Sequence, residues 1–220
     1  MRLMININNV YTKFCHANNN GRGICAGLCF VWVRMGLSAM ASKNEFLIYN
    51  KMANLLDEKF IFYYAAEFQK TQISLCYDYE NTKNIFNRLN GFMGKEGTVI
   101  TWETCTGALV KSRAEHMIKY PQDCKGTGAM LSFDEPGKNG HLCAILCDGR
   151  NTFFLDPNVG IYQLDRDDSF NTLGLYIKSR FSQSMQISDS AANSTFVQLK
   201  DKSSIRQLQI LGPGYRITNL

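Results

Sequence analysis

The stretch GRGICAGLCFVWVRMG, residues 21–36, places two cysteines four positions apart inside an apolar run. Apolar residues recur there at the three- and four-residue steps of one helical face, at Leu28, Val31, Trp32 and Met35. The pattern predicts a helix that begins at Cys25 and continues to about Ala41. A core helix does not need a thiol in its first turn, whereas a nucleophile gains from that place, because a helix N-terminus lowers the pKa of a thiol.

The composition fits one globular domain, which we expect to span residues 1–220, because 45% of the 220 residues are hydrophobic and 20% are charged. The net charge of +5 comes without a long Lys/Arg run and indicates a solvated surface, so no nucleic-acid partner is expected. No run approaches the ~18 consecutive apolar residues of a membrane span, and residues 1–14 lack the apolar core of a signal peptide. We therefore expect a soluble chain.

Eight cysteines occur in the chain, at Cys15, Cys25, Cys29, Cys76, Cys105, Cys124, Cys143 and Cys147. The length and the apolar content argue against a small domain held together by disulfides. Several of these cysteines stand inside apolar runs, where a free cysteine behaves as a small hydrophobic residue. We expect reduced thiols and a protein that works in a reducing cytosol.

The order of the predicted elements indicates an α+β domain in which N-terminal helices pack on a mostly antiparallel sheet. A short strand and an Asn-rich loop are expected in residues 1–20. One or two helices are expected in 42–72, where Ser42 and Glu45 have capping-box spacing, and further helices in 81–91 and 167–185. Strands are expected at 98–104, 128–133, 141–148, 151–157 and 194–201.

His141 opens the apolar strand HLCAILCD. Strand alternation places His141, Cys143, Ile145 and Cys147 on one face. A histidine in the first position of a buried strand stands at an end of the sheet, where it faces whatever packs there. This position makes His141 a candidate general base.

Asp156 ends the next strand, and Pro157 stops the ladder after it. If the two strands form a hairpin that turns at residues 148–151, His141 and Asp156 lie near the same end of the sheet. Asp156 then accepts the imidazole N–H and fixes the tautomer of the ring. With Cys25, these residues give the order nucleophile, base and orienting carboxylate of the cysteine hydrolases.

The Cys25 N–H and a nearby side-chain amide are expected to stabilise the oxyanion. Asn19 and Asn20 lie six and five residues before Cys25, and from the residues alone either one is a candidate donor.

Three blocks of the sequence, GICAGLCFVW (23–32), NGHLCAI (139–145) and FLDPNVG (154–160), resemble the signature blocks of the YopT/AvrPphB-type cysteine proteases. The resemblance covers residues from about 20 to 162, which it marks as the catalytic core, and it implies a papain-like fold. It makes Cys25 the nucleophile, His141 the base and Asp156 the orienting residue. The family analogy favours Asn20 as oxyanion donor, whereas papain-like spacing favours Asn19. Cys29 replaces a small residue of the family pattern, one turn after the nucleophile.

The resemblance also implies a partner and a location. Members of the family are bacterial virulence effectors that are secreted into host cells, where they cleave prenylated Rho-type GTPases or particular kinases, and some process themselves. We therefore expect a host protein substrate in the host cytoplasm. A basic face offers a possible attachment to the anionic inner leaflet of the host plasma membrane. A monomer without a metal or another cofactor is expected.

Two alternatives remain open at the level of the sequence. The first alternative is a different reaction at the same triad, since toxin domains with Cys-His-Asp sites catalyse deamidation or acyl transfer. A zinc-stabilised binding module is the alternative from another class, since Cys25 and Cys29, and Cys143 and Cys147, form two spaced pairs with His141 close to the second.

Overall fold

The computed structural model describes residues 1–18, 23–41, 59–74, 98–105, 108–133, 141–181 and 194–201. In this part of the chain the helices are α1 (Asn8–Asn18), α2 (Cys25–Ala41), α4 (Lys59–Ser74), α6 (Ala108–Lys119) and α7 (Phe170–Phe181), with a short 3-10 helix η1 (Pro121–Cys124). The strands are β1 (Arg2–Asn6), β2 (Thr98–Cys105), β3 (Thr127–Phe133), β4 (His141–Cys147), β5 (Thr152–Asp156), β6 (Gly160–Leu164) and β7 (Ser194–Asp201). None of these helices is long and apolar enough to cross a membrane.

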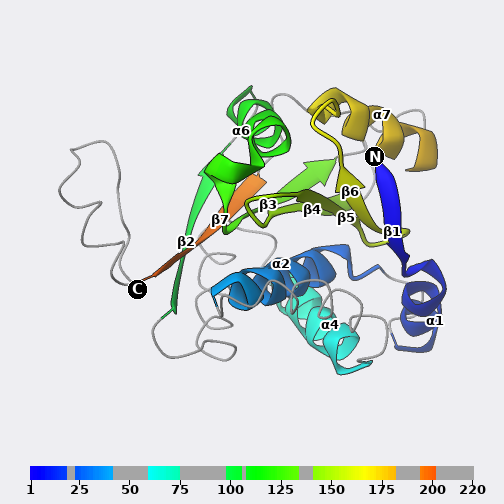
Figure 1. Cartoon of the computed structure of the whole chain (residues 1–220). Helices are drawn as coiled ribbons and strands as arrows, with labels where there is room; N and C mark the ends of the chain where they lie inside the picture. The colour runs from blue at the N-terminus through cyan, green and yellow to red at the C-terminus, as the bar shows by residue number, and fades with distance from the viewer. Residues whose placement is uncertain are drawn as a thin grey trace.

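The described strands form one seven-stranded sheet in the order β1-β6-β5-β4-β3-β7-β2. Every pairing in it is antiparallel. The sheet is covered by helices on both faces, with α1, α2 and α4 on one side and α6 and α7 on the other (Figure 1). The predicted α+β class, with helices packed on an antiparallel sheet, is therefore confirmed.

The alternation of side chains along β4 and β5 divides the core into two layers. Ala144, Leu146, Phe153 and Leu155 belong to the layer that also contains residues of α2 and α4. Cys143, Ile145, Cys147 and Phe154 belong to the layer that contains residues of α6 and α7. Both strands are therefore buried on both faces, and each large side chain among them contributes about 1.5–3 kcal/mol to folding.

The hairpin between β4 and β5 turns at residues 148–151, as predicted. The Asp148 carboxylate accepts hydrogen bonds from the backbone N–H groups of Arg150 at 2.7 Å and Asn151 at 2.6 Å. Gly149 has a φ of +94°, in the left-handed region that favours glycine. The turn sets a register with Ala144 opposite Leu155, so one further step places Asp156 opposite Cys143.

The N-terminal segment differs from the prediction. Residues 8–18, predicted as an Asn-rich loop, form α1. Tyr11, Phe14 and Cys15 recur at helical spacing and are buried, and the Asn6 side chain accepts the N–H of Asn8 at 3.0 Å. Local asparagine content argued for a loop, but burial of this apolar face and the Asn6 hydrogen bond stabilise a helix.

Three further elements were not predicted, namely α6, η1 and β6. In α6 the apolar positions Ala114, Met117 and Ile118 have helical spacing and are buried against the sheet. Strand β6 is short, and its pairing with β5 and β1 stabilises it. The predicted helix 81–91 and the start of the predicted helical segment 42–72, with its Ser42 and Glu45 box, lie outside the described residues. The later part of that segment is helical in α4.

Candidate active site

Cys25 is the first residue of α2, and neighbouring helices fix its position. The Tyr11 hydroxyl of α1 accepts a hydrogen bond at 3.0 Å from the backbone N–H of Ile24, the residue just before Cys25. Two residues after Cys25, the N–H of Gly27 donates to the Gln69 side chain of α4 at 3.2 Å. The start of α2 is thus held by two other helices, and Cys25 is half-buried there.

His141 and Asp156 form a buried pair at the end of the sheet. The distance from His141 Nε2 to Asp156 Oδ1 is 3.0 Å, and Asp156 is fully buried. The same Oδ1 atom accepts the backbone N–H of Asn158 at 3.0 Å. With Nε2 directed at the carboxylate, the other ring nitrogen, Nδ1, is the one available to the thiol of Cys25.

The electrostatics of Cys25 and His141 shift their pKa values in opposite directions. Burial alone would raise the pKa of the Cys25 thiol, but the hydrogen bond and charge of His141, with the N–H groups of Leu142 and Ala26, outweigh burial and lower it. Burial alone would lower the pKa of His141, but hydrogen bonds with Asp156 and Cys25 raise it to about 9. At neutral pH the arrangement therefore favours a thiolate beside an imidazolium.

The neighbouring cysteines lack this activation. Burial raises the pKa of Cys29 and of Cys143 well above the ordinary value, and the nearby charges of Cys25 and Asp156 raise both further. The Cys29 thiol donates a hydrogen bond at 3.3 Å to the backbone carbonyl of Leu142. Cys29 therefore joins α2 to β4, and the thiols described in this structure are all free.

His141, Cys143 and Asp156 are the described residues whose grouping suits a metal ion, since their ligand atoms lie within 4.8 Å of one another. However, His141 and Asp156 already satisfy each other, and the raised pKa of Cys143 opposes the thiolate that a metal requires. Cys147, part of the alternative zinc set, donates instead to the Pro121 carbonyl at 3.1 Å, at the other end of β4. The geometry favours an acid–base pair over a zinc site.

The predicted residues Cys25, His141 and Asp156 thus come together from α2, β4 and β5. His141 bridges the two core layers at the end of β4, since Cys25 belongs to the α2 side and Asp156 contacts α7 on the other. Asn19 and Asn20, the predicted oxyanion donors, lie outside the described residues.

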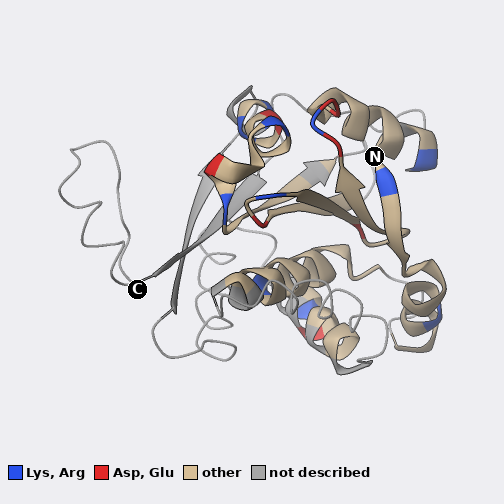
Figure 2. Ribbon diagram, in the orientation of Figure 1, with Lys and Arg blue, Asp and Glu red and all other residues tan. Residues whose placement is uncertain are grey.

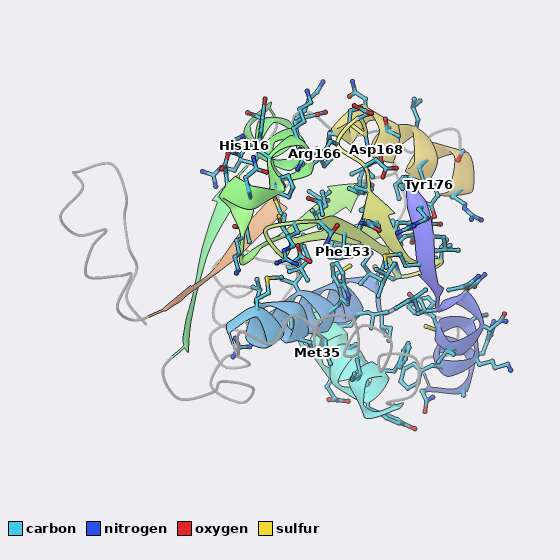
Figure 3. All side chains as sticks on the ribbon, in the orientation of Figure 1. Met35, His116, Phe153, Arg166, Asp168 and Tyr176 are labelled. Atoms are coloured by element: carbon cyan, nitrogen blue, oxygen red, sulfur yellow. The ribbon has the colours of Figure 1, made fainter. Side chains whose placement is uncertain are left out.

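Sequence reasoning missed Tyr176 of α7 (Figure 3), whose hydroxyl donates to Asp156 Oδ2 at 3.1 Å. Nothing in the sequence near Tyr176 signals that contact.

A helix that starts at a cysteine and packs on an antiparallel sheet carrying histidine and aspartate is the arrangement of papain-like cysteine peptidases. Residues 9–200 match the model of the Peptidase_C58 family, described as Yersinia/Haemophilus virulence surface antigen. The chain belongs to this family, the YopT/AvrPphB family, and is a cysteine peptidase.

Among solved structures, the chain is similar to Pseudomonas avirulence protein AvrPphB, with a TM-score of 0.46 and 19% sequence identity. The similarity covers 84% of this chain and 93% of that protein. No curated protein matches the sequence.

Proposed function

We propose that this protein hydrolyses a peptide bond in a host protein through a Cys25–His141–Asp156 triad. The observation that carries the proposal is the orientation of His141. Its Nε2 lies 3.0 Å from a buried carboxylate, and the hydrogen bond and charge of His141 lower the pKa of a thiol at a helix N-terminus. This is the geometry that nucleophilic catalysis by cysteine requires.

In this mechanism the Cys25 thiolate attacks the peptide carbonyl, and the N–H of Cys25 stabilises the oxyanion together with the side chain of Asn20 or Asn19. His141 then protonates the leaving amine, and the acyl-enzyme forms. His141 next takes a proton from water, which attacks the thioester and releases the second product. Asp156 keeps the ring oriented and stabilises its positive charge throughout.

The family supports a role as a virulence effector that acts on host proteins. Within that role we propose a secreted enzyme that reaches the host cytoplasm, acts as a monomer and cleaves a prenylated Rho-type GTPase or a kinase.

Figure 2 shows acidic and basic residues spread over both helical layers of the described chain. From the net charge of +5 we propose that basic side chains contact the anionic inner leaflet of the host plasma membrane.

An epoxysuccinyl probe tests the nucleophile directly. We expect the probe to label Cys25 in the wild-type protein and no cysteine in the Cys25→Ser variant, because Cys29 and Cys143 have raised pKa values. Peptide mapping by mass spectrometry identifies the labelled residue. Cys29→Ser is the matched control and should keep the label at Cys25. Equal labelling of several cysteines, or label that persists in Cys25→Ser, would contradict the proposal.

The activity should follow a bell-shaped pH profile. As pH rises, kcat/KM increases when the Cys25 thiol loses its proton, and this limb lies below the ordinary thiol range because the pKa of Cys25 is lowered. Above pH about 9 the His141 imidazolium loses its proton and the activity falls. The rate of peptide cleavage or of Cys25 acylation, measured from pH 4 to 10 at constant ionic strength, checks both limbs. An alkaline limb near 6.5 would show that His141 gains no stabilisation from its partners.

A further inference from the structure

The hydrogen bonds around Asp156 continue beyond His141 into α7 and β6. The Tyr176 hydroxyl donates to Asp156 Oδ2 at 3.1 Å, and the hydroxyls of Tyr176 and Tyr162 lie 2.8 Å apart. The two rings pack edge to face, with centroids 5.3 Å apart. The Arg180 guanidinium lies over the Tyr176 ring, 5.6 Å from its centroid. The phenol behind the carboxylate is therefore held in a fixed orientation.

The direction of this chain follows from proton counting. A phenol carries one proton, and Tyr176 gives its proton to Asp156, so Tyr162 must donate to the Tyr176 oxygen. Burial and then the bond with Tyr162 raise the pKa of Tyr176, so its hydroxyl keeps its proton over the working pH range. Tyr162, Tyr176 and Asp156 thus form a directed series of donors that ends on the carboxylate.

The two oxygens of Asp156 have separate partners. Oδ1 accepts from His141 and from the N–H of Asn158, and Oδ2 accepts from Tyr176. A fully buried carboxylate is stable only when it is hydrogen-bonded. A donor at Oδ2 also prevents rotation of the carboxylate about its Cβ–Cγ bond, which keeps Oδ1 directed at the imidazole.

We propose that Tyr176 is a positioning residue of the triad, which holds Asp156 so that its Oδ1 atom orients His141, and that Tyr162 supports Tyr176 in turn. This inference rests on the proposed function of Cys25 and His141. It predicts that the tyrosine hydroxyl acts on the imidazolium through the carboxylate and leaves the binding of substrate unchanged.

The pH dependence of His141 reflects the groups that surround the pair. They are Cys25 and Cys29 of α2, Cys143 of β4, Asp156 of β5, Tyr162 of β6, and Tyr176 and Arg180 of α7. Tyr176→Phe removes one hydroxyl from this set and changes no formal charge. A shift in the titration of His141 in that variant therefore reports the orientation of the carboxylate.

The test is a titration of His141 by NMR of protein labelled with 15N-histidine, which needs no substrate. In the wild type His141 should titrate at about 9. In Tyr176→Phe we expect a clear downward shift, because a carboxylate that is hydrogen-bonded at Oδ1 alone is less well oriented and stabilises the imidazolium less. Loss of a hydrogen bond to a charged group should also lower kcat by about 10-fold, with KM unchanged. Tyr162→Phe should shift the titration in the same direction by less.

Tyr120→Phe is the matched control, since this tyrosine is half-exposed and far from the pair in the chain. It should reproduce the wild-type titration and kinetics. An unchanged or raised pKa of His141 in Tyr176→Phe would overturn the inference, even if kcat falls. Failure of the proposed function is visible separately. In that case wild-type Cys25 would react with iodoacetamide no faster than the other thiols, and Cys25→Ala would leave the His141 titration unchanged.

Discussion

Cys25→Ala is expected to lower the rate of peptide hydrolysis by at least about 10³-fold, because it removes the proposed nucleophilic sulfur. The contacts that hold the start of α2 involve the backbone of Ile24 and Gly27 and not the thiol, so the loss of one sulfur leaves them intact. Thermal unfolding should therefore remain close to that of the wild type. Cleavage of a peptide library, followed by mass spectrometry, measures the loss and also separates hydrolysis from deamidation or acyl transfer.

Cys29→Ala is the matched control for this variant, since it makes the same change one turn further along α2. It removes the hydrogen bond to Leu142 and a buried thiol, so it should cost stability while leaving most of the activity. Full activity in Cys25→Ala would show that Cys25 is not the nucleophile. Complete loss of activity in a folded Cys29→Ala protein would also contradict the assignment.

His141→Ala should abolish turnover to a similar degree but is a less selective variant. It leaves the fully buried carboxylate of Asp156 without its histidine partner. Removal of one member of a buried ion pair costs about 3–5 kcal/mol, so the free energy of unfolding should fall together with the activity. The structure thus makes Cys25→Ala the better test of chemistry, and His141→Ala a test of how far the pair stabilises the fold.

The parts of the site that the sequence predicted have local signals. The helix at Cys25 follows from the spacing of Leu28, Val31 and Trp32, and the hairpin that aligns His141 with Asp156 follows from the turn at Gly149. In each case a period or a turn residue within about ten positions determines the geometry.

The parts that the sequence did not predict depend on contacts between distant segments. Tyr176 reaches Asp156 only because α7 packs on the face of β5 opposite α2, and neither the spacing nor the residue type indicates that. The contact of Tyr11 was missed for the same reason. Its hydroxyl accepts a hydrogen bond from Ile24, the residue before Cys25, and it lies in α1, which the sequence predicted as a loop. Such contacts require the tertiary arrangement of both helical layers.

Gly27→Ala is expected to lower the free energy of unfolding strongly, because residue 27 lies where α2 packs directly against the backbone of α4. A Cβ atom at position 27 would lie 1.8 Å from the backbone oxygen of Ala65 in α4, and 2.6 Å from its carbonyl carbon. Ala65 is fully buried, and its backbone atoms cannot move aside locally, so α2 and α4 must separate. We expect a loss of about 3 kcal/mol or more, which exceeds the gain of about 1 kcal/mol in helix propensity from replacing glycine.

Gly36→Ala provides the comparison within the same helix, because its new Cβ atom would meet a side-chain methyl group of Leu146 at 2.2 Å. A rotamer change at Leu146 relieves that contact, so Gly36→Ala should cost less than Gly27→Ala in urea unfolding. Since Gly27 lies two residues after Cys25, separation of α2 from α4 should also move the thiol from His141 and slow its alkylation at neutral pH. Gly27→Ala would contradict this account if it unfolded at the same urea concentration as Gly36→Ala and kept a reactive Cys25. The close contact between α2 and α4 would then not determine the position of the Cys25 thiol.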